Sequence, residues 1–172
     1  FTLNVTGIND EPTGVIAIKN LNEYEDNGKT INALDNYDVR VKDYLLSVVQ
    51  QISDKDGIRK EYEYLHDAYK YQWYREKTNS AGTPIGGATN QSYFPTIDDL
   101  GSQIFVRVSY IDNNGFTNSI ESKKTNKVIN HPPIIESNTC PTEINEAYNQ
   151  ELTCKVTATD KDLNSVISYK LQ

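Results

Sequence analysis

The amino-acid sequence predicts an all-β fold, and three observations carry that prediction. Short segments alternate apolar and polar residues with a period of two, most clearly from Ile104 to Tyr110. Turn-forming residues separate these segments, and the Asn114-Gly115 pair supports the positive φ angles of a hairpin turn over residues 112–115. The 172 residues include 12 Tyr, an aromatic content that argues against a disordered chain.

The same alternation predicts further strands. They are expected at residues 1–6, 44–49, 69–73, 116–120 and 152–158. Trp73, the single Trp, lies in one of these segments and is expected to anchor the core between two sheets. Residues 82–87 contain one Pro and three Gly, which indicate a turn.

Residues 58–69 leave two interpretations open. Apolar residues from Ile58 to Tyr69 recur at the spacing of a helix, which Ser53 or Asp54 would cap. The many Tyr and the alternation that follows favour strands with an irregular joint near residues 66–67.

Composition excludes several classes of function. The chain has 17 Lys and Arg against 24 Asp and Glu, and its net charge of −7 argues against a nucleic-acid partner. No apolar run approaches the roughly 20 residues of a membrane span. The chain has no Met and opens on a strand pattern, so we expect a piece of a longer polypeptide. Cys140 and Cys154 have no neighbouring His to complete a zinc site, and they either form a disulfide or remain free thiols.

Two short motifs occur twice, in the same order. The segment from Ile8 to Pro12 recurs loosely from Ile129 to Pro133, and Asp-Lys-Asp occurs at 54–56 and again at 160–162. The first motif is interpreted as a linker between domains. We therefore expect the last strand and linker of one domain at 1–12, a complete domain at 13–130 and the beginning of another at 131–172.

These segments resemble two kinds of tandem β-sandwich repeat from large bacterial surface proteins. Residues 53–57 and the Tyr-Gln-Trp-Tyr of 71–74 are similar to bacterial immunoglobulin-like repeats, and shorter matches follow in order at 86–89, 92–93, 99–101 and 106–110. The Asn-Asp-Glu-Pro of 9–12 and the Ala-Thr-Asp-Lys-Asp of 158–162 resemble cadherin-like repeats. Residues 19–42 and 58–68 depart from the pattern and are interpreted as insertions.

The resemblance implies a fold and a role. The fold is an immunoglobulin-like Greek-key β-sandwich at 13–130, flanked by parts of cadherin-like sandwich domains. The role is that of a non-catalytic repeat in an extracellular adhesin or fibre at the bacterial cell surface, where calcium stiffens adjacent repeats into a spacer. Glu146 resembles the acidic residue that cadherin-like domains place at the interdomain end.

The Asp-Lys-Asp motifs are candidate Ca²⁺ sites. Ca²⁺ takes about six to eight oxygen ligands, and two Asp at i and i+2 in a loop can turn toward one ion. The candidate ligands are Asp54 and Asp56, with Asn9, Asp10 and Glu11 from the first linker, and Asp160 and Asp162, with Asn130 from the second. The second linker has His131-Pro132 in place of Asp10-Glu11, which removes two oxygen ligands. The alternative is that Asp-Lys-Asp is only a polar turn.

Two other functions remain open. The Tyr content and the inserted segments would suit a domain that recognises a glycan or a host protein. The isolated strand at 1–6 would suit a polymerising subunit that donates Phe1, Leu3 and Val5 to an open sheet edge of a neighbouring copy, giving a head-to-tail filament. The sequence contains no Gly-x-Ser-x-Gly stretch and no phosphate-binding Gly-rich loop, and an enzyme is not expected.

Overall fold

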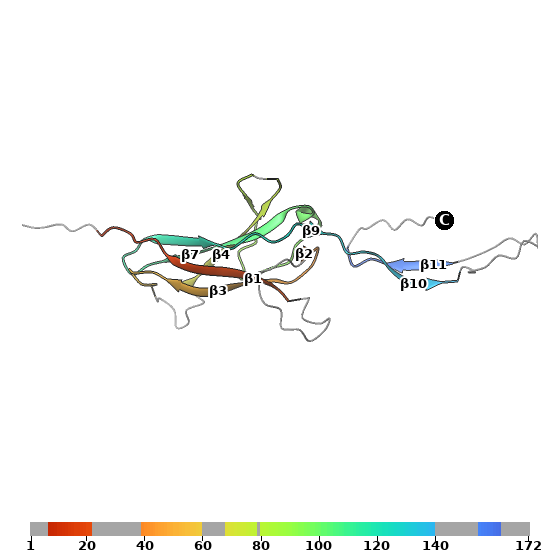
Figure 1. Cartoon of the computed structure of the whole chain (residues 1–172), viewed down its shortest axis with the longest axis horizontal. Helices are drawn as coiled ribbons and strands as arrows, with labels where there is room; N and C mark the ends of the chain where they lie inside the picture. The colour runs from red at the N-terminus through yellow and green to blue at the C-terminus, as the bar shows by residue number, and fades with distance from the viewer. Residues whose placement is uncertain (1–6, 22–38, 60–67, 79, 140–154, 163–172) are drawn as a thin grey trace, which may run out of the picture. The chain divides into compact units, whose positions relative to one another are not determined.

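The computed structural model describes residues 7–21, 39–59, 68–78, 80–139 and 155–162 (Figure 1). The chain divides into two compact units, Phe1–Ile129 (unit 1) and Asn130–Gln172 (unit 2). Several predictions fall outside the described residues. These are the donor strand with Phe1, Leu3 and Val5, most of the segment 58–69 with its two interpretations, the cysteine pair Cys140 and Cys154, and Glu146.

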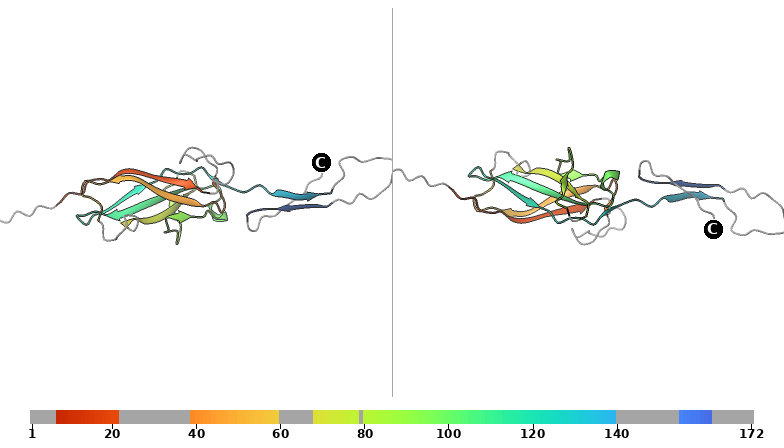
Figure 2. Two further views of the ribbon diagram at one scale, coloured as in Figure 1. Left: turned by 90° about the horizontal axis from the view of Figure 1, so that it is seen from below. Right: turned by 90° about the horizontal axis from the view of Figure 1, so that it is seen from above.

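Unit 1 is an all-β sandwich, which confirms the predicted fold class. One sheet has the order β1-β3-β6 and the other the order β5-β4-β7-β8, and the two lie face to face (Figure 1, Figure 2). The strands of the first sheet are β1 (Thr13–Asn20), β3 (Leu45–Ser53) and β6 (Ser92–Tyr93). Those of the second are β4 (Lys70–Glu76), β5 (Thr83–Pro84), β7 (Gln103–Ile111) and β8 (Thr117–Glu121). A short parallel pair, β2 (Val39–Arg40) with β9 (Val128–Ile129), and a 3-10 helix, η3 (Ile97–Asp99), complete the described part of unit 1.

The core lies between the two sheets. Trp73 is fully buried there, as predicted, and its indole Nε1 donates to the carbonyl of Asn90 at 2.9 Å. Alternate residues of β7 face the same core, and β1 and β3 supply apolar side chains from the opposite sheet. Each such side chain stabilises the fold by about 1.5–3 kcal/mol relative to leaving it exposed.

One side chain of β7 is buried on the opposite face of its sheet. By alternation Phe105 points away from the sandwich core, yet it is only 4% exposed. Tyr74 stacks on its ring with centroids 5.0 Å apart, and Gly82 lies against the same ring. The chain between β4 and β5 therefore covers part of this outer face, which a period of two does not predict.

Two sequence interpretations need correction. Residues 82–87 are not only a turn, because β5 pairs there with Tyr74 and Arg75 of β4, and Pro84 lies at the sheet edge where its missing N–H is tolerated. Residues 19–42 are not wholly an insertion. Their described parts complete β1 and form β2, and Val39 and Val41 are buried in the core.

Unit 2 is described as an antiparallel strand pair. β10 (Ile134–Asn138) pairs with β11 (Val156–Thr159), and β11 overlaps the described part of the alternation predicted at 152–158. All five residues of β10 are exposed, and Ile134 and Ile135 are 52% and 65% exposed. Within its described residues, unit 2 thus leaves apolar surface uncovered.

Candidate metal centre

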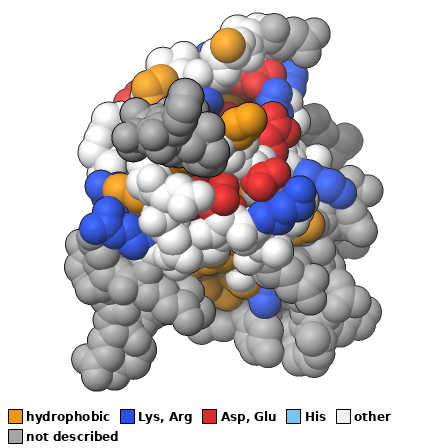
Figure 3. Space-filling view, turned by 90° about the vertical axis from the view of Figure 1, so that its left-hand side faces the viewer, with side chains coloured by type: hydrophobic (Ala, Val, Ile, Leu, Met, Phe, Trp, Pro, Cys, Tyr) orange, Lys and Arg blue, Asp and Glu red, His pale blue; other side chains and the backbone are white. Residues whose placement is uncertain are grey.

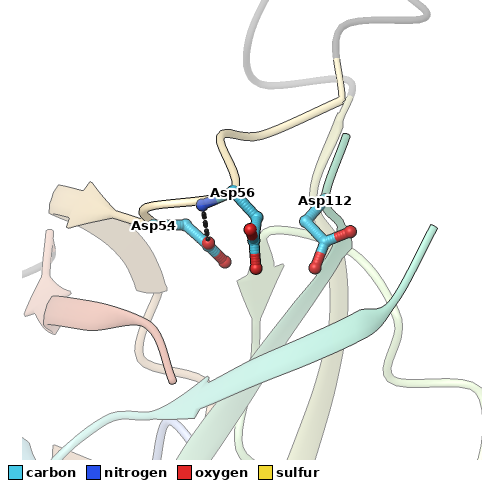
Figure 4. A group of neighbouring side chains, drawn as sticks. All are labelled: Asp54, Asp56 and Asp112. Carbon is cyan, nitrogen blue, oxygen red and sulfur yellow. Dashed lines mark hydrogen bonds between the residues drawn. The ribbon is translucent and has the colours of Figure 1, made fainter. Parts of the chain in front are cut away.

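Three aspartates meet at one end of unit 1 (Figure 4). Asp54 and Asp56 lie in the loop after β3, and Asp112 follows the last residue of β7. One carboxylate oxygen from each residue lies within 4.8 Å of the others. We call Asp54, Asp56 and Asp112 the acidic cluster.

Local backbone geometry positions the first two aspartates. The backbone N–H of Asp56 donates to Oδ1 of Asp54 at 2.9 Å, and Gly57 closes the turn with an N–H bond to the Asp54 carbonyl at 3.0 Å. Gly57 has a φ of 77°, which a residue with a Cβ rarely adopts. Its carbonyl accepts from the N–H of Asn113, so the loop is tied to the turn after β7.

Asp112 is the fully buried member of the cluster. Its Oδ1 accepts the backbone N–H groups of Asn114 and Phe116, each at 2.9 Å. Its Oδ2 accepts Nδ2 of Asn118 at 3.0 Å. These three hydrogen bonds stabilise the buried carboxylate, and without them its burial would be strongly unfavourable.

Asn118 and Tyr110 join Asp112 to the loop after β3. Nδ2 of Asn118 also donates to Oδ2 of Asp54 at 3.2 Å, and the Tyr110 hydroxyl donates to the same oxygen at 2.6 Å. Burial and the hydrogen bond to Asp54 raise the pKa of Tyr110 above its ordinary value of 10.0. The phenol therefore remains a donor to Asp54 throughout the physiological pH range.

The first linker contacts the acidic cluster directly. The backbone N–H of Asp10 donates to Oδ2 of Asp56 at 3.2 Å, while Nδ2 of Asn9 donates to Oδ1 of Asn118 at 2.8 Å. The Asp10 carboxylate pairs with the exposed Lys55 ammonium at 3.3 Å, and it is not part of the cluster. Glu11 is exposed, and no described contact joins it to the cluster. Figure 3 shows this end of unit 1, with acidic side chains gathered near its centre.

The geometry of the acidic cluster fits a divalent cation. Two ligands on opposite sides of one Ca²⁺ would lie about 4.6–5.2 Å apart, and the cluster's limit of 4.8 Å is compatible with that span. Its donors are all oxygen, the type that hard cations prefer. Among the described residues, no Lys or Arg forms an ion pair with Asp54, Asp56 or Asp112.

Unit 2 contains a related but smaller arrangement. The N–H of Asp162 donates to Oδ1 of Asp160 at 2.8 Å, and the N–H of His131 donates to Oδ2 of Asp162 at 2.7 Å. Asn130 directs its amide Nδ2 to the His131 carbonyl. In the part of unit 2 that the structure describes, no third Asp, Glu, His or Cys joins the pair.

Sequence reasoning missed Asp112 and Asn118 as members of the site. Residues 112–115 were interpreted as a hairpin turn, which the structure confirms. The sequence signal that could have indicated them is the position of Asp112 directly after the most regular strand and of Asn118 early in the returning strand. The pairing of β7 with β8 brings these two residues near each other. Contacts of the turn after β7 with the loop after β3 then place them beside Asp54.

No protein-family model, characterised protein or solved structure matches the chain. In the described residues, no helix has the length and hydropathy that crossing a membrane requires. The function is therefore inferred from the geometry of the chain itself.

Proposed function

We propose that this chain is a non-catalytic repeat module of a large extracellular bacterial surface protein, an adhesin or fibre, and that it acts as a calcium-stiffened spacer. The observation that carries the proposal is the contact between the first linker and the acidic cluster. The linker's Asp10 N–H bonds to Asp56, whose carboxylate lies within 4.8 Å of those of Asp54 and Asp112. A ligand that restrains the Asp56 carboxylate would therefore also restrain the linker through this hydrogen bond.

A cation would stabilise this end of unit 1 through charge. Three carboxylates in close proximity repel one another, and the repulsion is stronger where Asp112 is buried than it would be in water. Asp54, Asp56 and Asp112 would hold the ion, which would neutralise their charge. Binding to the folded state alone stabilises that state, by about 2.7 kcal/mol at a hundredfold excess over Kd.

The strand order supports an immunoglobulin-like type of sandwich for unit 1. The constant type has its first, second, fourth and fifth strands in one sheet and its third, sixth and seventh in the other. With β1, β3, β4, β5, β6, β7 and β8 counted as the seven strands, the two sheets of unit 1 follow this division except for β5, which pairs with β4. Together with the resemblance of the first linker and of residues 158–162 to tandem surface repeats, the order favours a module that works beside adjacent repeats outside the cell.

Thermal unfolding with calcium or with a chelator tests the proposal. The native chain is expected to unfold several degrees higher in millimolar CaCl₂ than in EDTA. Asp112→Asn removes a buried charge but retains an acceptor, and it is expected to lose most of that difference. Asp56→Asn, at a partly exposed position, is a second variant if Asp112→Asn folds poorly. The control is Asp98→Asn, an exposed aspartate outside the cluster.

Hydrogen exchange tests whether cation binding restrains the linker. Calcium is expected to slow exchange of the Asp10 amide, which donates to Asp56. Equal unfolding temperatures in calcium and chelator would contradict the calcium part of the proposal. A calcium effect that Asp112→Asn and Asp56→Asn both retain would place the ion elsewhere.

A second candidate function is supported by unit 2. The exposed β10, with Ile134 and Ile135 uncovered among the described residues, would accept a strand from a neighbouring copy. Deletion of residues 1–6 tests whether that segment is the donor in a head-to-tail filament. Sedimentation of the deleted chain should then show loss of assembly, and unchanged assembly would exclude this donor.

A further inference from the structure

A groove of about 440 Å³ opens on unit 1, and it shares no residue with the acidic cluster. One wall is formed by residues from 85–90, which follow β5, and the other by residues from 92–98, which run from β6 into η3. Arg75 of β4 also lines the groove. Gly86 and Gly87 border open space on one wall, since a Cβ at either position would meet nothing within 4 Å.

The polar part of the groove is held in place by a buried carboxylate. Asp99 is fully buried, and its Oδ1 pairs with Nε of Arg75 at 2.9 Å. Its Oδ2 accepts the hydroxyl of Tyr93 at 2.6 Å and the backbone N–H of Thr96 at 2.7 Å. Arg75 also donates through Nη1 to the carbonyl of Asp98 at 3.3 Å. The guanidinium is thus fixed, and its charge is balanced within the protein.

An exposed aromatic ring forms the apolar part of the groove. Phe94 lines the groove and is 54% exposed. Its ring stacks on Tyr44 with centroids 4.9 Å apart and an interplanar angle of 11°, which restrains its orientation. An aromatic ring that is oriented but not buried is a preformed stacking surface.

Hydrogen-bonding groups lie on the same groove. Asn90, Ser92 and Asp98 line it, and none of their side chains hydrogen-bonds to another described residue. Apolar surface combined with a few convergent polar groups is the usual composition of a small-molecule site. A sugar ring matches it, because a sugar presents C–H groups on one face and hydroxyls around its edge.

We propose that this groove binds a neutral saccharide, with Phe94 against the C–H face of a sugar ring and Asn90, Ser92 and Asp98 bonded to its hydroxyls. A neutral ligand is favoured over an acidic one for two reasons. Asp99 already balances the charge of Arg75, and the Asp98 carboxylate on the groove would repel an anion. The proposal is independent of the cation, since the two sites share no side chain.

Saturation-transfer difference NMR on the full chain tests the proposal. The probes are the methyl glycosides of glucose, galactose, mannose and N-acetylglucosamine, with glucuronic acid and N-acetylneuraminic acid as acidic competitors. Transfer to the ring C–H protons of at least one neutral probe is expected. Phe94→Ala is expected to weaken its binding about fivefold. Phe116→Ala, which removes an exposed aromatic ring outside the groove, is the matched control and should bind as the native chain does.

The outcomes separate the alternatives. No transfer to any neutral probe would overturn the proposal, as would stronger binding of the acidic sugars. Undiminished binding by Phe94→Ala would place the saccharide elsewhere. Trp73 fluorescence and thermal unfolding verify that each variant is folded. If Phe94→Ala is destabilised, Asp98→Ala is the second variant, and undiminished binding by that variant would also overturn the placement.

Discussion

The backbone N–H of Asp10 donates to Oδ2 of Asp56, and this bond joins the linker to the acidic end of unit 1. Unit 2 repeats the arrangement, since the N–H of His131 donates to Oδ2 of Asp162. In both units the second Asp of the motif donates its own N–H to the first. The linker contribution shared by the two units is therefore a backbone group. The change from Asp10 to His131 leaves that bond unaltered, although it removes a carboxylate.

Two substitutions at Asp10 are expected to distinguish the contribution of its side chain to stability from that of its backbone N–H. Asp10→Ala removes only an exposed ion pair with Lys55 and should change the free energy of unfolding by less than about 0.5 kcal/mol. Asp10→Pro removes the N–H donor to Asp56 and should destabilise unit 1 by about 1 kcal/mol. Urea unfolding followed by Trp73 fluorescence measures both. Equal effects of the two variants would contradict a backbone role.

The ion pair of Arg75 with Asp99 should contribute far more to stability than that of Arg107 with Glu121. Asp99 is fully buried, and Arg75→Met would leave its charge without a partner, which costs about 3 kcal/mol. Arg107 and Glu121 are 44% and 46% exposed, so Arg107→Met should cost less than about 1 kcal/mol. Urea midpoints of the two variants compare the pairs directly.

A rescue variant distinguishes lost charge from lost packing in that pair. Adding Asp99→Asn to Arg75→Met removes the unpaired charge while preserving the shape of the side chain. Part of the lost stability should return. A double variant that is no more stable than Arg75→Met would show that the buried charge was not the cause.

Alkaline pH is expected to destabilise unit 1 through two phenols, the buried Tyr110 and the partly buried Tyr93. Burial and a hydrogen bond to a carboxylate raise the pKa of Tyr110, beside Asp54, and of Tyr93, beside Asp99, above the ordinary 10.0. The unfolded chain then loses protons before the folded chain does. Stability is therefore complete below about pH 10 and falls as the pH rises beyond it.

Urea unfolding between pH 8 and pH 11 measures this effect, with the pH range chosen to bracket the ordinary Tyr pKa of about 10. Tyr110→Phe lacks one of the two phenols and should show a shallower decline than the native chain. The variant loses a hydrogen bond to Asp54, so its stability at neutral pH is the reference for its own decline. Parallel declines in the native chain and the variant would exclude Tyr110 as a contributor.

Much of unit 1 follows from local sequence, but the acidic cluster follows only in part. The alternation in 104–110 predicts β7, and the turn residues that follow predict the hairpin to β8. Asp54 and Asp56 are close in sequence, so their shared loop could be predicted as well. Asp112 could not be placed beside them, because that contact depends on how the loop after β3 meets the turn after β7.

By itself, the sequence determined the strand segments, the Asn-Gly turn, the buried Trp73 and the repeated Asp-Lys-Asp motif. Backbone conformation and side-chain alternation are set by residues a few positions apart, so a single chain segment contains the information. Only the tertiary structure decided that Asp112 and Asn118 lie beside Asp54 and that Asp10 contributes its backbone N–H to Asp56. These contacts link segments far apart in the chain, and the packing of two sheets brings them together.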